Sequence, residues 1–508
     1  MKKGEIYGRL FSRYGSHELP EVKFRERISG ENIRKILGSS GDFSINRIYV
    51  GGNRNIEAWL CFVDGLVSGE SVAREVIAPA TNVDRLGAAK SEADAVNAML
   101  HGAVFNCTVN LRRSMDEIIG DILSGFCAII FDKSGEALSF EAKSGDRRSV
   151  DTPEVEKNVK GPREAFVETF RVNTALLRRK LRDPALRIEE STKGRRSATK
   201  LGLIYIEGLT DPKLVSGLRA RLEKLDVDAV LSTGSIEEYI ADGRRTPFPQ
   251  MLVTERPDKL AIGLLEGRVG ILADGLPTAF LAPANFSEFF RVPEDNSMNF
   301  IVATLLTLLR YMALFISIFL PAAYVAVALY HQQMIPTKLL ISIMESRKDV
   351  PFSTAAEVLG LLITFELLQE AGLRLPRNIG ETVSIIGGLV VGQSAVEAKV
   401  VSPMVVIIVA IAGITGFTVP NHDMSSALRA CRFAAVILSL TMGLYGIMLG
   451  TALLLYHLGS LENFGVAYMQ PFAGGGERQI LRAVTKFPLS RSKRRKSFLH
   501  PLDERNQR

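Results

Sequence analysis

The chain has 508 residues, a net charge of +7 at pH 7 and a pI near 9.1, so it is mildly basic and long enough for about three domains. Its four cysteines, Cys61, Cys107, Cys127 and Cys431, form no pair with the spacing of metal ligands, and the six histidines are dispersed. The N-terminal stretch MKKGEIYGRLFSRYG lacks an apolar run, so we expect no signal peptide. Composition therefore favours buried free thiols and gives no support to a metal or another cofactor.

The first 300 residues have the mixed pattern of α/β structure and contain an internal repeat. CFVDGLVSGESVAREVI (Cys61–Ile77) is similar to IYIEGLTDPKLVSGLRARL (Ile204–Leu222), and each predicts a strand, an acidic residue with glycine, and an amphipathic helix. GFCAIIFDKSGEALSFEA, which starts at Gly125, is similar to GRVGILADGLPTAFLAP, which starts at Gly267. Each of these two stretches predicts a β-hairpin. Both matches share an offset of about 140 positions, which makes a chance similarity improbable.

The common offset predicts two related α+β subdomains at residues 30–150 and 195–299. A short N-terminal tail (1–29) precedes them, and residues 151–194 are expected to form a helical linker between them. The linker contains a basic run from Arg178 to Arg182. Two interpretations of this run stay open: a solvated helix that joins the subdomains, or a basic face for a partner or for lipid head groups.

The first half offers no motif that argues for an enzyme. It has no GxxxxGK[ST], GxSxG or HExxH sequence. The charged stretch TERPDKL (Thr254–Leu260) is interpreted as an arginine–carboxylate pair that braces a turn at Pro257, with a catalytic cluster as the alternative. We therefore predict no catalytic, cofactor-binding or metal site. The basic run KFPLSRSKRRK (Lys486–Lys496) lies close to hydrophobic segments, which favours the cytoplasmic side of a membrane over nucleic acid as its environment.

Long apolar runs occupy residues 300–457 and predict an α-helical polytopic membrane domain. The stretch at about 353–371 is too charged for a simple span, since it contains Glu357, Glu366 and Glu370, and we expect a re-entrant or interfacial helix there. Membrane spans are expected at about 312–330, 382–398, 401–420 and 433–456.

Four spans place both termini on the same side, and the absence of an export signal predicts the cytoplasm for both. Residues 458–508 then form a basic cytoplasmic tail. Lysines and arginines between His331 and Gly380 oppose this arrangement, because the positive-inside rule would keep that segment in the cytoplasm as well. The topology of residues 331–380 stays open.

The predicted span at about 382–398, together with the residues just before it, has a ridge of small residues at every fourth position: Gly380, Ser384, Gly388 and Gly392. Such a ridge lets the backbones of transmembrane helices approach closely. Gln393 and Glu397 fall on a different, partly polar face, which faces either a water-filled pathway or a subunit contact, unless Glu397 simply marks the end of the span. We take Gln393 and Glu397 as pore candidates and the four small residues as helix-packing candidates.

Several long stretches resemble the A subunits of GerA-type spore germinant receptors. Among them are GPREAFVETFRVNTALLRRKLRDP, LLEGRVGILADGLPTAFLAP, RYMALFISIFLPAAYVAVALYH and EAGLRLPRNIGETVSIIGGLVVGQSAVEAKVVSP. Together with shorter matches they cover nearly everything from about residue 30 to residue 475, in the order of the family. The sequence is thus identified as a member of this family.

The resemblance implies a membrane subunit in the inner membrane of dormant spores that triggers germination in response to nutrients. It implies a homo-oligomer, with a pentamer as the expected assembly, that forms a nutrient-gated ion channel together with a transporter-like B subunit and a lipoprotein C subunit. Two alternatives stay open: an accessory SpoVAF-like member without its own nutrient response, and a secondary transporter. We expect contact with membrane lipid and none with nucleic acid.

Overall fold

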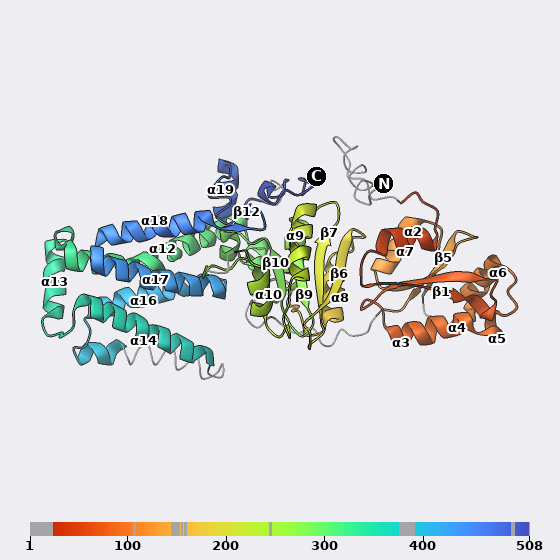
Figure 1. Ribbon diagram of the computed structural model, residues 1–508, viewed down its shortest axis with the longest axis horizontal. Coiled ribbons are helices and arrows are strands. Elements are labelled where there is room, and N and C mark those ends of the chain that lie inside the picture. The colour runs from red at the N-terminus through yellow and green to blue at the C-terminus, as the bar shows by residue number, and fades with distance from the viewer. Residues whose placement is uncertain are drawn as a thin grey trace. The chain divides into compact units, whose positions relative to one another are not determined.

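The computed structural model describes the chain at residues 24–104, 108–143, 153, 156, 160–242, 246–374, 392–488 and 493–506. The chain divides into two compact units, whose elements are labelled in Figure 1. The α+β unit comprises Met1–Asp242, Met251–Pro283 and Leu489–Arg508, and the helical unit comprises Gly243–Gln250 and Ala284–Pro488. The predicted fold class, an α+β N-terminal region followed by apolar helices, is confirmed.

The first sheet of the α+β unit has five strands in the order β1-β2-β4-β5-β3, and all neighbouring strands pair antiparallel. Helices α2 and α7 cover one face, and the helical segment formed by α3, η2 and α4 covers the other (Figure 1). The elements are α2 (Gly30–Leu37), β1 (Phe43–Tyr49), η1 (Val50–Gly52), β2 (Glu57–Val63), α3 (Gly69–Ser71), η2 (Val72–Ile77), α4 (Ala78–Thr81), α5 (Val83–Leu86), α6 (Glu92–Ala98), η3 (Met99–Ala103), β3 (Val109–Arg112), α7 (Met115–Leu123), β4 (Phe126–Phe131) and β5 (Glu136–Glu141).

Apolar spacing explains how these elements pack. In α7, Met115, Ile118, Ile119 and Ile122 are buried, and their i, i+3, i+4, i+7 spacing places them on one helix face. Strand β4 is the central strand, and its sequence FCAIIF is almost continuously apolar and buried, as expected when both faces of a sheet are covered. The core of the first subdomain therefore lies on both sides of β4.

The second sheet repeats the topology of the first: its order is β6-β7-β9-β10-β8, again with antiparallel neighbours. Each strand occupies the position of its counterpart in the first sheet, so the predicted pair of related subdomains is confirmed. The elements are α8 (Phe170–Lys180), β6 (Leu186–Lys193), β7 (Thr199–Ile206), α9 (Pro212–Glu223), α10 (Thr233–Ile240), β8 (Leu252–Thr254), α11 (Pro257–Leu265), β9 (Val269–Ala273) and β10 (Ala279–Ala282).

The structure differs from the predicted linker at 151–194. Helix α8 precedes β6 just as α2 precedes β1, and β6 pairs with β7 along its whole length, from Leu186 opposite Ile206 to Lys193 opposite Thr199. The second subdomain thus starts before residue 195, because the repeat includes the helix and the edge strand that sequence similarity did not reveal. The basic run from Arg178 begins in α8 rather than in a free linker.

Residues 493–506 return to the second subdomain. Leu502 N–H donates to the carbonyl of Leu209 at 2.8 Å, and Arg495 Nε donates to the carbonyl of Leu265 at 2.7 Å. Lys496 Nζ pairs with the Glu266 carboxylate at 2.8 Å. Part of the basic C-terminal segment is therefore built into the α+β unit.

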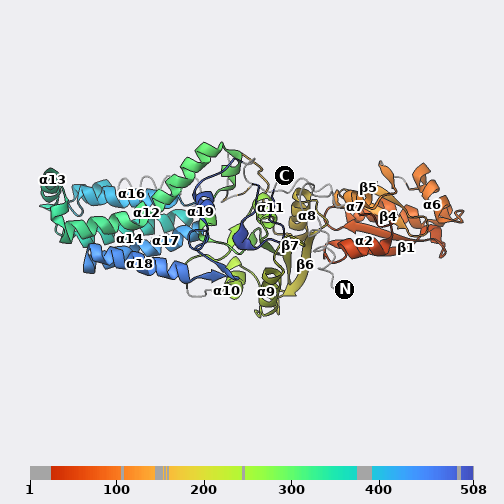
Figure 2. The ribbon, with the colours of Figure 1, turned by 90° about the horizontal axis from the view of Figure 1, so that it is seen from above.

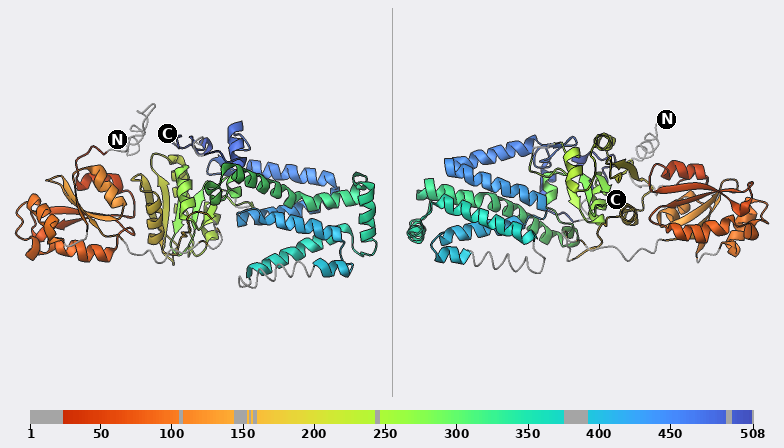
Figure 3. Two further views of the ribbon diagram at one scale, coloured as in Figure 1. Left: turned by 180° about the vertical axis from the view of Figure 1, so that it is seen from behind. Right: turned by 60° about the horizontal axis from the view of Figure 1, so that its bottom comes forward.

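The helical unit consists of long helices that run alongside one another (Figure 2, Figure 3). Two of them, α12 and α17, are long and apolar enough to cross a membrane, and α16 and α18 are shorter apolar helices. The elements are η4 (Phe286–Phe290), η5 (Pro293–Ser297), α12 (Phe300–Tyr330), η6 (Gln332–Met334), α13 (Thr337–Arg347), α14 (Thr354–Arg374), α16 (Pro403–Phe417), α17 (His422–Met442), α18 (Leu444–Ser460), β11 (Glu462–Asn463), β12 (Val466–Ala467) and α19 (Glu477–Val484). The last described element, η8 (Ser497–Leu499), belongs to the α+β unit.

Two of the predicted spans correspond to single helices. The stretch 312–330 lies inside α12, which stays helical through Pro321, and 401–420 contains α16. The predicted re-entrant segment at 353–371 forms one continuous helix, α14. Most of the stretch 382–398 lies outside the described residues. Membrane crossing and re-entrant placement stay predictions for all of these segments.

The stretch predicted as one span at 433–456 is divided between two helices. Helix α17 ends at Met442, and α18 starts at Leu444. Gly443 separates them with φ of +61°, and a Cβ at this position would lie 3.1 Å from Tyr330 Cδ2. An apolar run does not reveal such a break, because the turn depends on a single glycine packed against another helix.

Candidate functional site

A charged cluster lies where α14, α16 and α17 meet inside the helical unit. Arg429 Nη1 donates to Glu366 Oε1 at 2.6 Å, and Arg432 Nη2 lies 3.9 Å from Glu366 Oε2. Arg432 Nη1 also donates to the carbonyl of Ala412 at 3.3 Å. The Arg432 side chain is 2% exposed, so this cation is almost fully enclosed by the helices. We call Glu366, Arg429 and Arg432 the central charge cluster.

The central charge cluster contains more cations than anions. Two guanidinium groups face one carboxylate, and Glu366 Oε2, Arg429 Nε and Arg432 Nε have no hydrogen-bond partner within the described part of the chain. Charged groups within apolar helices are costly and usually face other helices, water or a transport path. The cluster can therefore hold three helices in one arrangement, or supply polar groups to a path between them.

The sequence analysis noted Glu366 as one of the charges that argue against a simple span at 353–371, and it did not select Arg429 or Arg432. Both arginines lie just before the apolar run predicted at 433–456. Their i, i+3 spacing was the available signal, because it puts both side chains on the same face of one helix. What the spacing could not supply was the partner, which lies 63 residues earlier in the chain.

The predicted pore candidates lie elsewhere. Gln393 Nε2 donates to Glu397 Oε1 at 2.8 Å, and both side chains are exposed in a helical segment that covers residues 392–397. Of the small-residue ridge, Gly392 is buried, and a Cβ there would lie 3.5 Å from Val406 Cγ1 of α16. Gly380, Ser384 and Gly388 lie outside the described residues. The roles given to these six residues stay predictions.

Small residues do bring helices together at other positions. Ser317 Oγ of α12 donates to the carbonyl of Ala412 in α16 at 3.1 Å, and Ser439 Oγ of α17 donates to the carbonyl of Ala322 in α12 at 2.6 Å. A Cβ on Gly413 would lie 2.6 Å from the Phe365 ring. Close backbone approach with hydroxyl-to-carbonyl bonds is typical of packing between membrane helices.

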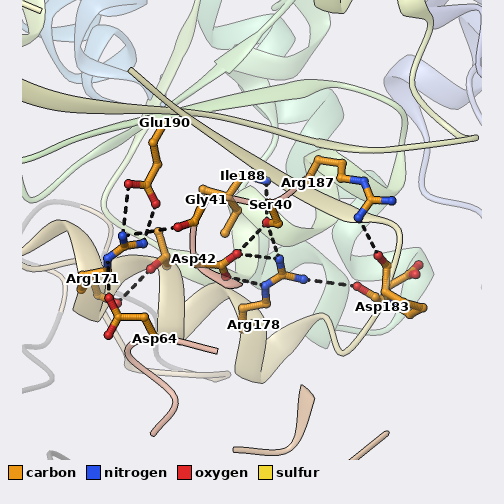
Figure 4. A network of polar contacts seen from close by, with 12 residues as sticks. Ser40, Gly41, Asp42, Asp64, Arg171, Arg178, Asp183, Arg187, Ile188 and Glu190 are labelled. Carbon is orange, nitrogen blue, oxygen red and sulfur yellow. Dashed lines mark hydrogen bonds and ion pairs between the residues drawn. The ribbon is translucent and has the colours of Figure 1, made fainter. Parts of the chain in front are cut away.

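A second charged network joins the two repeats of the α+β unit (Figure 4). Arg178 of α8 donates to both carboxylate oxygens of Asp42, from Nε at 2.8 Å and from Nη2 at 3.0 Å. Ser40 Oγ donates to Asp42 at 2.6 Å and accepts from Arg178 at 2.8 Å. The side chains of Asp42 and Arg178 are 0% and 2% exposed. We call Ser40, Asp42 and Arg178 the interrepeat clasp.

Electrostatics explain why the clasp tolerates burial. Burial would raise the pKa of the Asp42 carboxyl, but the charge of Arg178 and the hydrogen bonds from Arg178 and Ser40 outweigh it, so the pKa lies below its usual value. Every oxygen of the carboxylate thus has a donor, which is the condition under which a buried ion pair is stable.

Further contacts around the clasp fix the same interface. Arg187 Nη1 donates to the carbonyl of Ile36 at 2.8 Å, and Gly41 N–H donates to the carbonyl of Ile188 at 2.8 Å on the edge strand β6. Arg171 Nε lies 3.0 Å from Asp64 Oδ2, while its Nη1 donates to Glu190 at 2.5 Å (Figure 4). The loop after α2 is therefore attached to the second repeat by backbone and side-chain bonds together.

The stretch Thr254–Leu260 forms a brace, as the first of its two interpretations predicts. Arg256 is buried and donates to Asp258 at 3.0 Å and 2.7 Å, next to the start of α11. It also donates to the carbonyls of Glu156 and Pro162. The Arg256 guanidinium therefore holds in place the segment that leads into α8.

The α+β unit, the apolar helices and the charges enclosed among them define a membrane-associated protein with a large polar N-terminal region. The sequence profile of the family described as "Bacillus/Clostridium GerA spore germination protein" matches residues 31–498. The chain belongs to this family, which confirms the resemblance drawn from its sequence.

Individual relatives agree with this assignment. The chain is 38% identical over 455 residues to spore germination protein KA of Bacillus subtilis (strain 168), covering 90% of this chain and 83% of that protein. It is 36% identical over 475 residues to spore germination protein GerLA of Bacillus cereus, covering 93% of this chain and 95% of that protein. It is also 38% identical over 439 residues to the uncharacterized membrane protein YfkQ of Bacillus subtilis (strain 168), covering 86% of this chain and 84% of that protein.

Among solved structures, the chain is similar to the N-terminal domain of the A subunit of the Bacillus megaterium spore germinant receptor GerK3. The two share 28% sequence identity with a TM-score of 0.40, covering 50% of this chain and 93% of that one.

Proposed function

We propose that this protein is the A-type membrane subunit of a spore germinant receptor and triggers germination when nutrients are sensed. In this proposal it acts as a homo-oligomeric, nutrient-gated ion channel in the spore inner membrane, together with a transporter-like B subunit and a lipoprotein C subunit. Membership of the family supports the germination role. The observation that supports the channel is the central charge cluster, because charges enclosed among apolar helices are typical of ion paths and of helices that change their arrangement.

The contacts of the C-terminal segment support an even number of membrane crossings. Residues 495, 496 and 502 bond to the second subdomain, which precedes the helical unit in the chain. A chain that leaves this subdomain, passes through the bilayer and returns to it must start and finish on the same side. We place that side in the cytoplasm, since the basic residues of the C-terminal segment favour it.

The test is the release of potassium and other monovalent cations from spores with and without this protein, before and after addition of a nutrient mixture. Loss of release on deletion and its recovery on complementation support the receptor subunit. Unchanged timing and amount contradict a nutrient-gated channel and favour the accessory role. Replacing Gln393 or Glu397 by leucine then tests each as a pore residue, and unchanged conductance with intact assembly removes that residue.

A further inference from the structure

A second polar cluster lies near the ends of α12, α13, α14 and α16 that are remote from Glu366. Glu357 in the first turn of α14 is its centre and is 2% exposed. Its Oε2 accepts from the N–H of Ser402, the residue that precedes α16, at 2.7 Å. Its Oε1 lies 3.4 Å from Arg347 Nε at the end of α13. Tyr324 of α12 is near Arg347, Glu357 and Ser402.

The cluster contains several buried polar atoms that lack a hydrogen-bond partner among the described residues. Thr354 and Ser402 are both 0% exposed, so neither hydroxyl reaches bulk solvent. In native proteins nearly all such atoms are bonded to protein or to ordered water, because burying a polar group without a hydrogen bond is unfavourable. Five atoms form no hydrogen bond of normal geometry among the described residues: Tyr324 OH, Arg347 Nε, Thr354 Oγ1, Glu357 Oε1 and Ser402 Oγ. Within this set Arg347 Nε and Glu357 Oε1 form an ion pair at 3.4 Å, and the hydroxyl of Tyr324 lies close to that of Ser402.

The chemistry of these five atoms selects the ligand. Arg347 Nε can only donate, Glu357 Oε1 can only accept, and the three hydroxyls can do both. A bound cation would find oxygen atoms, but it would also face the Arg347 guanidinium and the positive N-terminal ends of α14 and α16. An anion would face the Glu357 carboxylate at close range. Water matches both the donors and the acceptors without adding charge.

We propose that Tyr324, Arg347, Thr354, Glu357 and Ser402 form a binding site for ordered water inside the helical unit. Water there bonds to the Thr354 hydroxyl and completes the hydrogen bonds of the Arg347–Glu357 ion pair and of the Tyr324 and Ser402 hydroxyls, so that four helices share one hydrogen-bonded group. Helix α13 lies between α12 and α14 in the chain, and the site connects the end of this helix to the start of α16. It is separate from the central charge cluster and does not depend on the proposed channel function.

Hydroxyl-radical labelling of the full-length protein in lipid nanodiscs tests the site, with mass spectrometry as the readout. Radicals formed from water label side chains beside it, so Tyr324 should be oxidised at least about fivefold faster than Phe365, whose ring packs against Gly413. The double variant Thr354→Val, Ser402→Ala removes two hydroxyls with little change in volume. Labelling of Tyr324 should then fall at least about threefold.

Thr415→Val is the matched control, because Thr415 Oγ1 already donates to the carbonyl of Ile411 at 2.7 Å. It should leave Tyr324 labelling unchanged. If the double variant does not fold, each single substitution is compared in its place. Labelling of Tyr324 no faster than that of Phe365 would overturn the proposal, as would labelling that the hydroxyl deletions leave unchanged.

Discussion

Replacing Asp42 by asparagine should destabilise the α+β unit strongly, because it leaves the Arg178 guanidinium buried without a counter-charge. Asp42 and Arg178 share two hydrogen bonds at 2.8 Å and 3.0 Å, and neither side chain is more than 2% exposed. Removing one member of such a pair costs about 3–5 kcal/mol, against a typical domain stability of about 5–15 kcal/mol. The expected loss is therefore a large part of the stability of the first repeat.

The chain provides its own probe for this measurement. Trp59 is the single tryptophan, and it lies in β2, where its Nε1 donates to Asp132 at 2.7 Å. Denaturant unfolding of the full-length protein, followed by tryptophan fluorescence, therefore reports on the first repeat. The control is Glu70→Gln, because Glu70 is 86% exposed in its pair with Arg74 and should cost less than about 1 kcal/mol.

The pH dependence gives an independent check of the clasp. The pKa of Asp42 lies below 3.8 in the folded protein, so its contribution to stability is present above the unfolded pKa of about 3.9 and is lost as the pH falls through the lower folded value. Wild-type protein should lose stability over that acidic range more steeply than Asp42→Asn. A loss below about 1 kcal/mol at neutral pH, with the same acid dependence in both proteins, would refute the reasoning.

Three further predictions concern other parts of the molecule. Arg432→Met should reduce nutrient-triggered ion release at least about tenfold with assembly intact, while Arg374→Met, at a side chain that is 78% exposed, should leave it unchanged. Gly443→Ala should destabilise the protein by about 1–3 kcal/mol in thermal unfolding, because φ is +61° and the added Cβ would press on Tyr330, whereas Gly459→Ala should not destabilise it. Cys127 should resist maleimide at pH 8 in the native protein and react after unfolding, because burial raises its pKa to about 12; mass spectrometry of the modified peptide measures this, and rapid native labelling would contradict it.

The topology of the α+β unit could be predicted to a large extent, because strands and amphipathic helices leave local periodic patterns. The offset between the stretches that start at Cys61 and Ile204 identified the repeat, and both five-stranded sheets follow the same order. A helix was expected within 151–194, but the assignment of α8 to the second repeat and the strand β6 were both missed. Their counterparts α2 and β1 share the geometry but little sequence, and the basic run in α8 gave it the pattern of a solvated linker.

The charged sites depend on contacts that no local pattern contains. Asp42 and Arg178 lie 136 residues apart, and Glu366 and Arg429 lie 63 residues apart. Sequence periodicity tells which face of a helix a residue occupies, and apolar length tells which helices can enter a membrane. The packing of elements that are distant in the chain decides which carboxylate meets which guanidinium, and whether an apolar run turns at a glycine. Sequence periodicity does not contain this information, because burial and the low dielectric of the interior arise only when those elements come together.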